Sequence, residues 1–354
     1  MPDEFFNFSA PINDQTSYGL VALNVISNTS CKTFPIGQIS YNFANNLFSN
    51  DVIYNSCHFD EWNRDLPSVR LYHQFALAES IGRGKRVGWP IFELDRFSKK
   101  EICDLNSLDE IIVCSKWAKE VILDNGVNKK ISIVPLGVNT ECFKPIPEVI
   151  ASRSNDDTYG FFSCGKYEVR KGQDQIVEAF NLAFSNNDKV ELFLSMFNQF
   201  MTSEDLRKIK EGYSKTKLGD KIKFVGPWKS QQRLAEWMNV VDCGVFPSKA
   251  EGWGLETLEM MACGKPVIVS NYSGHTEYCN IDNSLLIDVN NKTSAYDGKW
   301  FFNQGNWGVI ETSDIVELMR FAYSNRIKQN KYGIETAHHF SWTNTVNRLK
   351  DAIQ

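Results

Sequence analysis

The sequence predicts an α/β protein with two successive Rossmann-like domains that face a central cleft. The chain has 354 residues, a length that suits about two domains. Short apolar runs alternate with amphipathic stretches in both halves, as in α/β folds. A polar stretch with two prolines, residues 144–158, separates the halves. We therefore expect an N-terminal domain over residues 1–150, a second domain over residues 151–337 and a C-terminal helix over residues 338–354.

The first half contains five apolar runs typical of strands and one clear amphipathic helix. The helix is expected over residues 115–125, because Ser115 is a good N-cap and Gly126 suits the position after its end. The strands are expected near residues 35–40, 68–73, 85–92, 110–114 and 131–135.

The second half repeats the alternation of strands and helices. Strands are expected near residues 159–164, 190–195, 221–225, 241–246 and 266–269, and helices near 173–185, 203–213, 230–239, 254–263 and 313–326. This alternation predicts a parallel sheet. The terminal stretch FSWTNTVNRLKDAIQ predicts one more helix, capped by Ser341 or Thr343.

The most informative segment runs from Pro247 to Glu277. An apolar strand precedes a loop with Glu251 and Gly252-Trp253-Gly254, and a helix then begins near Leu255. Glycines let the backbone approach a ligand closely, and a helix N-terminus offers free N–H groups to an anion. A diphosphate there would bring an attached ribose close to Glu259, which lies about one helical turn further on. Glu251 could reach a sugar hydroxyl beyond the phosphates. The alternative is an ordinary helix with surface glutamates.

A second candidate site follows the first strand of the second domain. Lys166, Arg170 and Lys171 lie at the carboxyl end of this strand, next to Gly165. Open α/β sheets bind ligands at that edge. Lys166 and Lys171 could neutralise a diphosphate without a metal ion. The alternative is a solvated loop that happens to be basic.

Together the two segments resemble the group 1 (family four) retaining nucleotide-sugar glycosyltransferases, which have the GT-B fold. Glu251 and Glu259 match the family's E-x7-E motif, and Gly165-Lys166…Lys171-Gly172 matches its G-R…K-G phosphate motif. Lys166 replaces the usual Arg, which keeps the charge and loses the bidentate fork. The fold implied by the resemblance returns its C-terminal helix to the first domain. The resemblance also implies catalytic roles for Glu251, Lys171 and Lys166, and donor binding by Gly165, Arg170, Gly252, Trp253, Gly254, Leu255, Glu259 and Gly19.

The first domain resembles the family less closely. Residues 13–19 occupy the place of the family's glycine-rich loop, and only Gly19 matches it clearly. His73 and Glu93 follow strands where the family places acceptor-side or sugar-side groups, although a lone histidine is often only structural. The candidates for this side are His73, Glu93, Asp14, Arg83 and Arg86.

The resemblance implies a hexosyl- or pentosyltransferase that moves a sugar from a nucleotide-diphosphate donor, expected to be a UDP-sugar, to an acceptor hydroxyl. It implies retention, and neither a metal ion nor another cofactor is expected. The expected acceptor is a saccharide. One alternative is a hydroxymethylated base in DNA, as in phage DNA glycosyltransferases. Lesser alternatives are a lipid-linked acceptor and a non-catalytic nucleotide-sugar-binding module. A basic cluster permits the DNA alternative, and the net charge of −5 argues mildly against it. The cluster comprises Arg83, Lys85, Arg86, Arg96, Lys99 and Lys100.

Composition sets the expected compartment. The chain is 42% hydrophobic and 23% charged, as globular proteins are, which excludes a disordered chain. Its nine cysteines are scattered and form no C-x-x-C pair, which indicates free thiols in a reducing compartment. The acidic N-terminus does not look like a signal peptide, and no apolar run reaches the ~18 residues of a membrane span. We expect a cytoplasmic protein, in a bacterial cell or a phage-infected host, without stable membrane insertion.

Overall fold

The computed structural model describes residues 4–14, 16–41, 48–57, 62–152, 157–228 and 230–354. The chain divides into two compact units, Met1–Gly137 with Phe340–Gln354, and Val138–His339. The chain therefore leaves the first unit before residue 150. One reason is local: the backbone N–H of Ile146 donates to Asn239 Oδ1 at 2.8 Å, which attaches this segment to the second unit.

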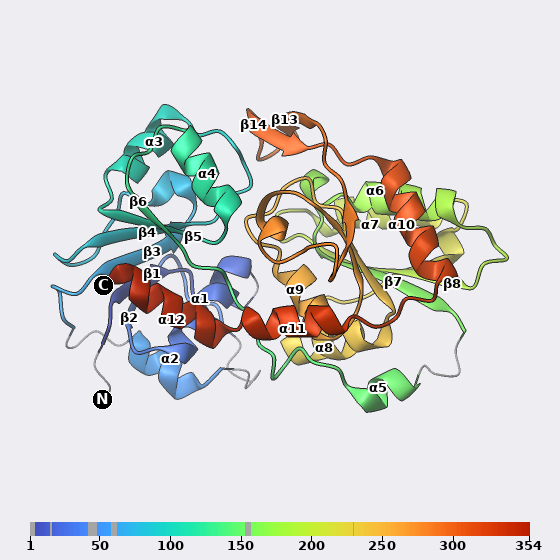
Figure 1. The fold of residues 1–354 in the computed structure, drawn as a ribbon, viewed down its shortest axis with the longest axis horizontal. Helices are drawn as coiled ribbons and strands as arrows, with labels where there is room; N and C mark the ends of the chain where they lie inside the picture. Colours follow the sequence, from blue (N-terminus) through green and yellow to red (C-terminus); the bar gives the residue numbers. More distant parts are fainter. Residues whose placement is uncertain (1–3, 15, 42–47, 58–61, 153–156, 229) are drawn as a thin grey trace. The chain divides into compact units, whose positions relative to one another are not determined.

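The described part of the first unit forms a six-stranded parallel sheet in the order β2-β1-β3-β4-β5-β6 (Figure 1). Four of the five expected strands are confirmed. The strand expected near residues 35–40 is wrong, because β2 ends at Pro35 and Gly37 takes φ +78°, which no strand accommodates. The strands are β1 (Asn7–Ala10), β2 (Lys32–Pro35), β3 (Ser68–Tyr72), β4 (Arg86–Pro90), β5 (Glu110–Val113) and β6 (Lys130–Ile133).

Helices flank this sheet, and the end of the chain supplies one of them. The helix expected at Ser115 is confirmed, since Ser115 Oγ accepts the N–H of Ala118 at 3.2 Å. The C-terminal helix is capped by Ser341 and packs against α1, so it belongs to the first unit as expected (Figure 1). The helical segments are α1 (Ser17–Asn28), α2 (Asn50–Ser56), η2 (Gln74–Ala76), α3 (Lys99–Asn106), α4 (Lys116–Asp124) and α12 (Trp342–Ile353).

The second unit has its own six-stranded parallel sheet, in the order β12-β11-β10-β7-β8-β9 over its described residues. The chain runs outward from β7 to β9, then restarts on the other side of β7 with β10. The strand order therefore reverses between β7 and β10, and open α/β sheets bind ligands at such a switch point. The strands are β7 (Tyr159–Lys166), β8 (Val190–Phe197), β9 (Ile222–Phe224), β10 (Cys243–Phe246), β11 (Val267–Ser270) and β12 (Leu285–Ile287).

The helices expected around this sheet are confirmed to within about two residues. Tyr159, Phe161 and Leu192 on the strands are fully buried in one core with Phe180 of α6 and Met319 of α10. Burial on both faces explains why these strands read as continuous apolar runs. The helical segments are α5 (Pro147–Ser152), η3 (Val169–Lys171), α6 (Gln173–Ala183), α7 (Ser203–Ser214), η4 (Gly219–Lys221), α8 (Gln231–Val240), α9 (Leu255–Ala262), η5 (Ser273–Glu277), α10 (Thr312–Ser324) and α11 (Lys331–His339).

A hairpin stands apart from both sheets. β13 (Lys292–Tyr296) and β14 (Phe302–Gly308) pair with each other in antiparallel fashion between β12 and α10. The sequence analysis did not predict this hairpin. Within the described chain, no helix is both long enough and apolar enough to cross a membrane.

Candidate active site

The two candidate segments of the second unit meet at the switch point of its sheet. β7 and β10 are parallel neighbours, so the loops that follow them lie at the same edge. The Lys249 N–H donates to the Arg170 carbonyl at 2.8 Å, which joins the two loops. Gly172 has φ +73°, and a Cβ there would lie 2.9 Å from the Pro247 carbonyl oxygen. This close contact requires a glycine.

Glu251 is held between two cations. Its Oε1 lies 2.8 Å from Lys171 Nζ, and its Oε2 lies 2.9 Å from Arg170 Nη1. Burial alone would raise the pKa of Glu251, but Arg170 and Lys171 hold that pKa well below its ordinary value. Burial would likewise lower the pKa of Lys171, while Glu251 and Glu256 raise it. Both partners are therefore charged at neutral pH.

The three cations differ in their access to solvent. The side chain of Arg170 is 6% exposed and also contacts Glu168 Oε2 at 2.9 Å and the Ala250 carbonyl at 2.6 Å. It is fixed behind Glu251. The Lys166 side chain is 45% exposed and pairs with Glu168 Oε1 at 2.8 Å. A ligand can thus reach Lys166 far more readily than Arg170.

Contacts with His275 and Tyr278 fix the backbone just before α9. Gly254 has φ +92°, and a Cβ there would lie 2.5 Å from His275 Nε2, so only glycine fits. The Trp253 ring is buried against Tyr278, with 4.9 Å between centroids. Tyr278 Oη donates to the carbonyls of Trp253 and Gly254 at 3.1 and 2.7 Å. The side chain of Trp253 is thus structural, and its loop offers a ligand backbone groups that lead to Leu255, the first residue of α9.

Other contacts hold the rest of this loop. A Cβ at Gly274 would lie 2.6 Å from the Gly252 carbonyl oxygen, which shows how closely η5 supports the loop. The Gly274 N–H donates to the Glu251 carbonyl at 2.9 Å, and the Glu251 N–H donates to Ser273 Oγ at 2.7 Å. The backbone of Glu251 is therefore as firmly placed as its side chain.

Glu256 is a site residue that the sequence analysis missed. It lies in the first turn of α9, and its Oε1 contacts Lys171 Nζ, so Lys171 is shared by two carboxylates. Gly165 has φ +138°, and a Cβ there would lie 3.2 Å from the same oxygen. Lys171 and Glu256 lie far apart in sequence, and only the fold brings them together.

Glu259 lies about one turn further along α9 and is buried. Burial raises its pKa to about 8, and the charge of Glu256 adds to this effect. A carboxyl group in this state can both donate and accept a hydrogen bond, which suits a vicinal diol.

His275 is a second missed residue. It is buried beneath Gly254, with Ser270 Oγ 3.3 Å from Nδ1 and Thr257 Oγ1 3.4 Å from Nε2. Burial lowers its pKa to about 4, although Glu251 and Glu256 oppose the shift. A neutral imidazole therefore supports the N-terminus of α9.

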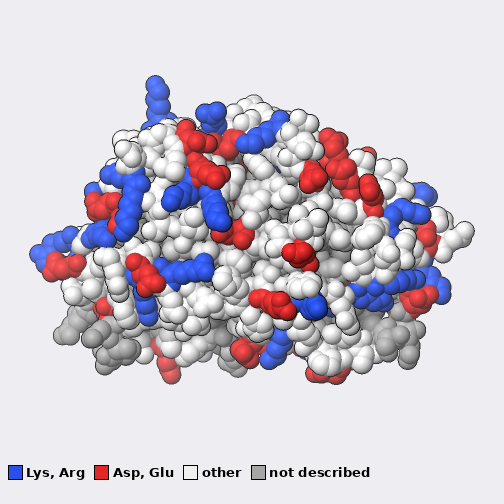
Figure 2. Space-filling model, viewed as in Figure 1, with Lys and Arg blue, Asp and Glu red and all other residues white. Residues whose placement is uncertain are grey.

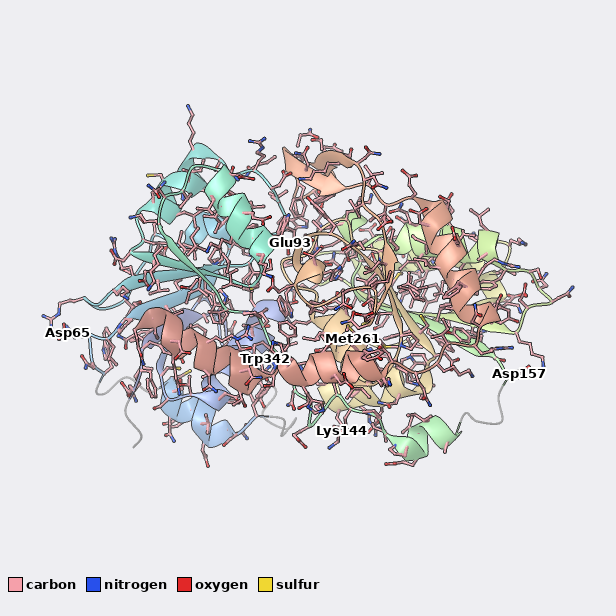
Figure 3. The ribbon with its side chains drawn as sticks, in the orientation of Figure 1. Asp65, Glu93, Lys144, Asp157, Met261 and Trp342 are labelled. Atoms are coloured by element: carbon pink, nitrogen blue, oxygen red, sulfur yellow. The ribbon has the colours of Figure 1, made fainter. Side chains whose placement is uncertain are left out.

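The first unit places four predicted residues at the carboxyl ends of three adjacent strands. Asp14 and Gly19 follow β1, His73 follows β3, and Glu93 lies on the loop after β4 (Figure 3). Gly19 is buried near the start of α1, where a Cβ would lie 2.0 Å from the Asn13 carbonyl oxygen. Gln15, in the same loop, lies outside the described residues.

Tyr18 connects two of these loops and was also missed. Its hydroxyl donates to the Ile91 carbonyl at 2.5 Å and lies 3.1 Å from His73 Nδ1. The His73 ring stacks on Phe75 at 5.0 Å with an interplanar angle of 7°. His73 is thus held in one orientation at this edge.

The structure divides the basic cluster that the sequence suggested. Arg83 precedes β4 and Arg86 is its first residue, whereas Lys99 and Lys100 begin α3 after the strand. A five-residue strand is about 15 Å long, so the two groups lie at opposite edges of the sheet. Arg83 pairs with Asp65 at 3.1 Å and Arg86 with Asp109 at 3.4 Å. Arg83 and Arg86 are therefore remote from His73 and Glu93.

Charge is mixed on the surface. Figure 2 shows acidic and basic side chains interspersed on the viewed face. Across the described ranges, no group of three or more His, Cys, Asp or Glu side chains is arranged to hold a metal ion.

Comparison with known families and sequences finds matches to the second unit. Residues 148–298 match the family described as "Glycosyl transferases group 1". A mannosylfructose-phosphate synthase of Agrobacterium fabrum is 24% identical over 49% of this chain and 40% of its own length. A D-inositol 3-phosphate glycosyltransferase of Pseudarthrobacter chlorophenolicus is 27% identical over 45% of this chain and 39% of its own length. The chain thus spans about two fifths of these curated relatives.

Solved structures match nearly the whole chain. Anabaena HepE in complex with UDP and glucose has a TM-score of 0.71 at 14% identity, covering 99% of both chains. A sucrose-phosphate synthase from Thermosynechococcus elongatus has a TM-score of 0.65 at 17% identity, covering 97% of this chain and 86% of that one. These similarities confirm the GT-B fold.

Proposed function

Residues 148–298 of this chain match the glycosyl transferases group 1 family, and from this match we propose that the protein transfers a sugar from a UDP-sugar to an acceptor hydroxyl. One observation carries the proposal. Lys171, Glu251 and the N-terminus of α9 converge at the switch point between β7 and β10. That is where an α/β sheet binds a nucleotide.

In this proposal the donor diphosphate binds between α9 and the loop after β7. The free N–H groups of the helix, Lys171 and the exposed Lys166 stabilise the charge that develops on the leaving diphosphate. They are already in place before the reaction, so little reorganisation is needed. The two lysines neutralise the diphosphate charge that a divalent cation would otherwise neutralise, so the proposed reaction is metal-independent.

The two glutamates have different tasks. Glu251 is ionised and fixed, which suits it to accept hydrogen bonds from hydroxyls of the donor sugar. Glu259 holds the ribose diol. The choice of UDP rests on Anabaena HepE, whose solved structure contains UDP and glucose. Retention at the anomeric carbon rests on the family resemblance.

The acceptor in this proposal is a saccharide. Two relatives support it by their names, a mannosylfructose-phosphate synthase and a D-inositol 3-phosphate glycosyltransferase. DNA is not favoured, because the basic residues that suggested it are split between two edges and Arg83 and Arg86 are paired with carboxylates. The nine cysteines are free, which agrees with a reducing compartment, and we place the protein in the cytoplasm.

A thermal-shift panel of nucleotide sugars tests this function. A ligand that binds only the folded state raises the melting temperature by mass action. We expect UDP-sugars to stabilise the protein more than adenosine or cytidine diphosphate sugars, equally with EDTA and with Mg²⁺. No shift with any nucleotide sugar, or a shift that requires Mg²⁺, contradicts the proposal.

A further inference from the structure

The β13–β14 hairpin crosses the carboxyl edge of the second sheet. At its base, the Gly308 N–H donates to the carbonyl of Lys249, in the loop after β10, at 2.8 Å. At its turn, Lys299 Nζ donates to the carbonyl of Phe200, just after β8. β7 lies between β10 and β8 in the sheet, so the hairpin passes the end of the strand that bears Lys166.

Four large aromatic side chains remain exposed along this path. Phe200, Tyr296, Trp300 and Phe302 are 48, 56, 54 and 63% exposed, and we call them the aromatic platform. The rings form two pairs, Phe200 with Trp300 at 5.3 Å and Tyr296 with Phe302 at 6.2 Å between centroids. Neighbouring exposed apolar groups commonly mark a binding surface.

The turn that presents Trp300 is firmly held. Asp297 Oδ1 accepts the backbone N–H groups of Lys299, Trp300 and Phe301 at 2.8, 2.8 and 2.9 Å. Burial alone would raise the pKa of Asp297, but these bonds hold it below its ordinary value. Below the turn, Phe301 packs on the buried Trp307, with 4.8 Å between ring centroids. A fixed aromatic surface loses little conformational entropy when a ligand binds.

The platform adjoins the end of β7, where Lys166 lies. Lys166 Nζ lies 5.5 Å from the centre of the Phe200 ring. Lys166 and Phe197 are direct partners in the β7–β8 ladder, and Phe200 follows three residues later. A molecule on the platform would therefore lie beside the proposed diphosphate site.

The chemistry of the hairpin selects the ligand class. Residues 292–308 contain three charged side chains, two Lys and one Asp, among many amides and hydroxyls. Lys299 binds a carbonyl and Lys292 lies over the Tyr272 ring at 5.6 Å. Sites for single-stranded nucleic acid pair aromatic rings with a strongly basic groove, which these residues do not provide. Neutral sugars instead pack their C–H faces on aromatic rings and bind amides through their hydroxyls.

We propose that the aromatic platform binds a neutral saccharide segment of the acceptor, remote from the hydroxyl that reacts. This inference rests on the proposed function, because it assigns part of the acceptor. It adds a binding surface on the second unit to the residues considered on the first.

The test compares W300A/F302A with F321A, which removes a similarly exposed aromatic from α10. Binding of malto-, manno- and galacto-oligosaccharides of three to six sugars is measured by saturation-transfer NMR. We expect the wild type to bind at least one series at millimolar concentration, and the double variant to bind it about tenfold more weakly. F321A should match the wild type. UDP affinity and UDP-sugar hydrolysis should stay unchanged in both variants.

These readouts separate the two proposals. Failure of the wild type to bind UDP contradicts the proposed function, whereas saccharide binding tests the platform independently. The platform is overturned if the wild type binds none of the oligosaccharides or if W300A/F302A binds them normally. It is also overturned if the double variant instead loses binding to phosphatidylcholine vesicles or to an oligothymidine strand, or changes oligomeric state, with saccharide binding intact.

Discussion

The carboxyl edges of the two parallel sheets differ in how their side chains are held. In the second unit, Glu251, Lys171 and Arg170 form buried ion pairs, and Gly172 and Gly254 keep the backbone close around them. In the first unit, Tyr18 and His73 are only partly buried and are oriented by one hydroxyl and by ring stacking. One edge presents charges fixed by buried ion pairs, and the other presents half-buried aromatic, imidazole and carboxylate groups, Asp14 and Glu93 among them.

The difference indicates a division of labour. Fixed charge suits a diphosphate, whose geometry is the same in every donor, and it requires a preorganised site. Half-buried aromatic and hydroxyl groups suit an acceptor whose shape varies. Changes at the second edge should therefore affect chemistry strongly, and changes at the first should affect it less.

The largest effect is expected from K171A. Lys171 is a largely buried cation of the proposed diphosphate site, and removing a preorganised donor from such a site typically costs about 10²–10³ in turnover. The measurement is steady-state transfer together with circular dichroism. K189A, which removes an exposed lysine paired with Asp157, is the control and should stay normal. Wild-type turnover in folded K171A would remove Lys171 from the site.

The next effect concerns stability and pH. The pKa of Glu259 is about 8 in the folded protein against an ordinary 4.5, so unfolding between these values releases a proton. Rising pH therefore lowers the free energy of unfolding in this window, by up to about 1.4 kcal/mol per pH unit. Chemical denaturation at a series of pH values measures the free energy of unfolding. In E259Q this free energy should no longer fall as the pH rises, while E204Q, on exposed α7, should behave like the wild type. If the free energy of unfolding fell with pH equally in E259Q and in the wild type, the raised pKa of Glu259 would be contradicted.

A smaller effect is expected in the first unit. H73A should raise the acceptor KM about fivefold and lower transfer accordingly, since a hydrogen bond contributes about 1 kcal/mol. Y18F, which removes the hydroxyl that orients His73, should act in the same direction. UDP affinity, measured by calorimetry, should be unchanged in both. Loss of UDP binding in H73A would show that the two edges do not divide the work in this way.

The smallest effect is expected from R83A/R86A. Both arginines lie at the amino end of β4 and are paired with Asp65 and Asp109. Transfer to a saccharide should stay within about twofold of normal at low and at physiological salt. Binding to hydroxymethylated DNA that weakens with salt, and is lost in this variant, would restore the DNA alternative.

The two carboxyl edges also differ in how far their residues could be predicted from the sequence. Lys171, Glu251 and Glu259 lie in motifs whose glycines and helix start are readable locally. The fold pairs Lys171 with Glu251 and places Glu259 about one turn further along α9. Glu256 and His275 could not be found this way, because each acts on a residue brought close only by packing. Tyr18 depends on contacts with loops far along the chain. The β13–β14 hairpin was missed because most of its strand residues are exposed or half-buried, so its strands lack alternating apolar residues; only Ala295, Trp307 and Gly308 are buried.

The central claim is that Glu251 and Glu259 divide the donor between sugar and ribose. Calorimetry with UDP in the presence of EDTA, combined with a transfer assay, tests it on wild type, E251Q and E259A. We predict that E259A binds UDP about tenfold more weakly, whereas E251Q binds it within about threefold of normal and loses about a hundredfold in transfer. Equal loss of UDP affinity in both variants, or normal transfer by E251Q, would contradict the account.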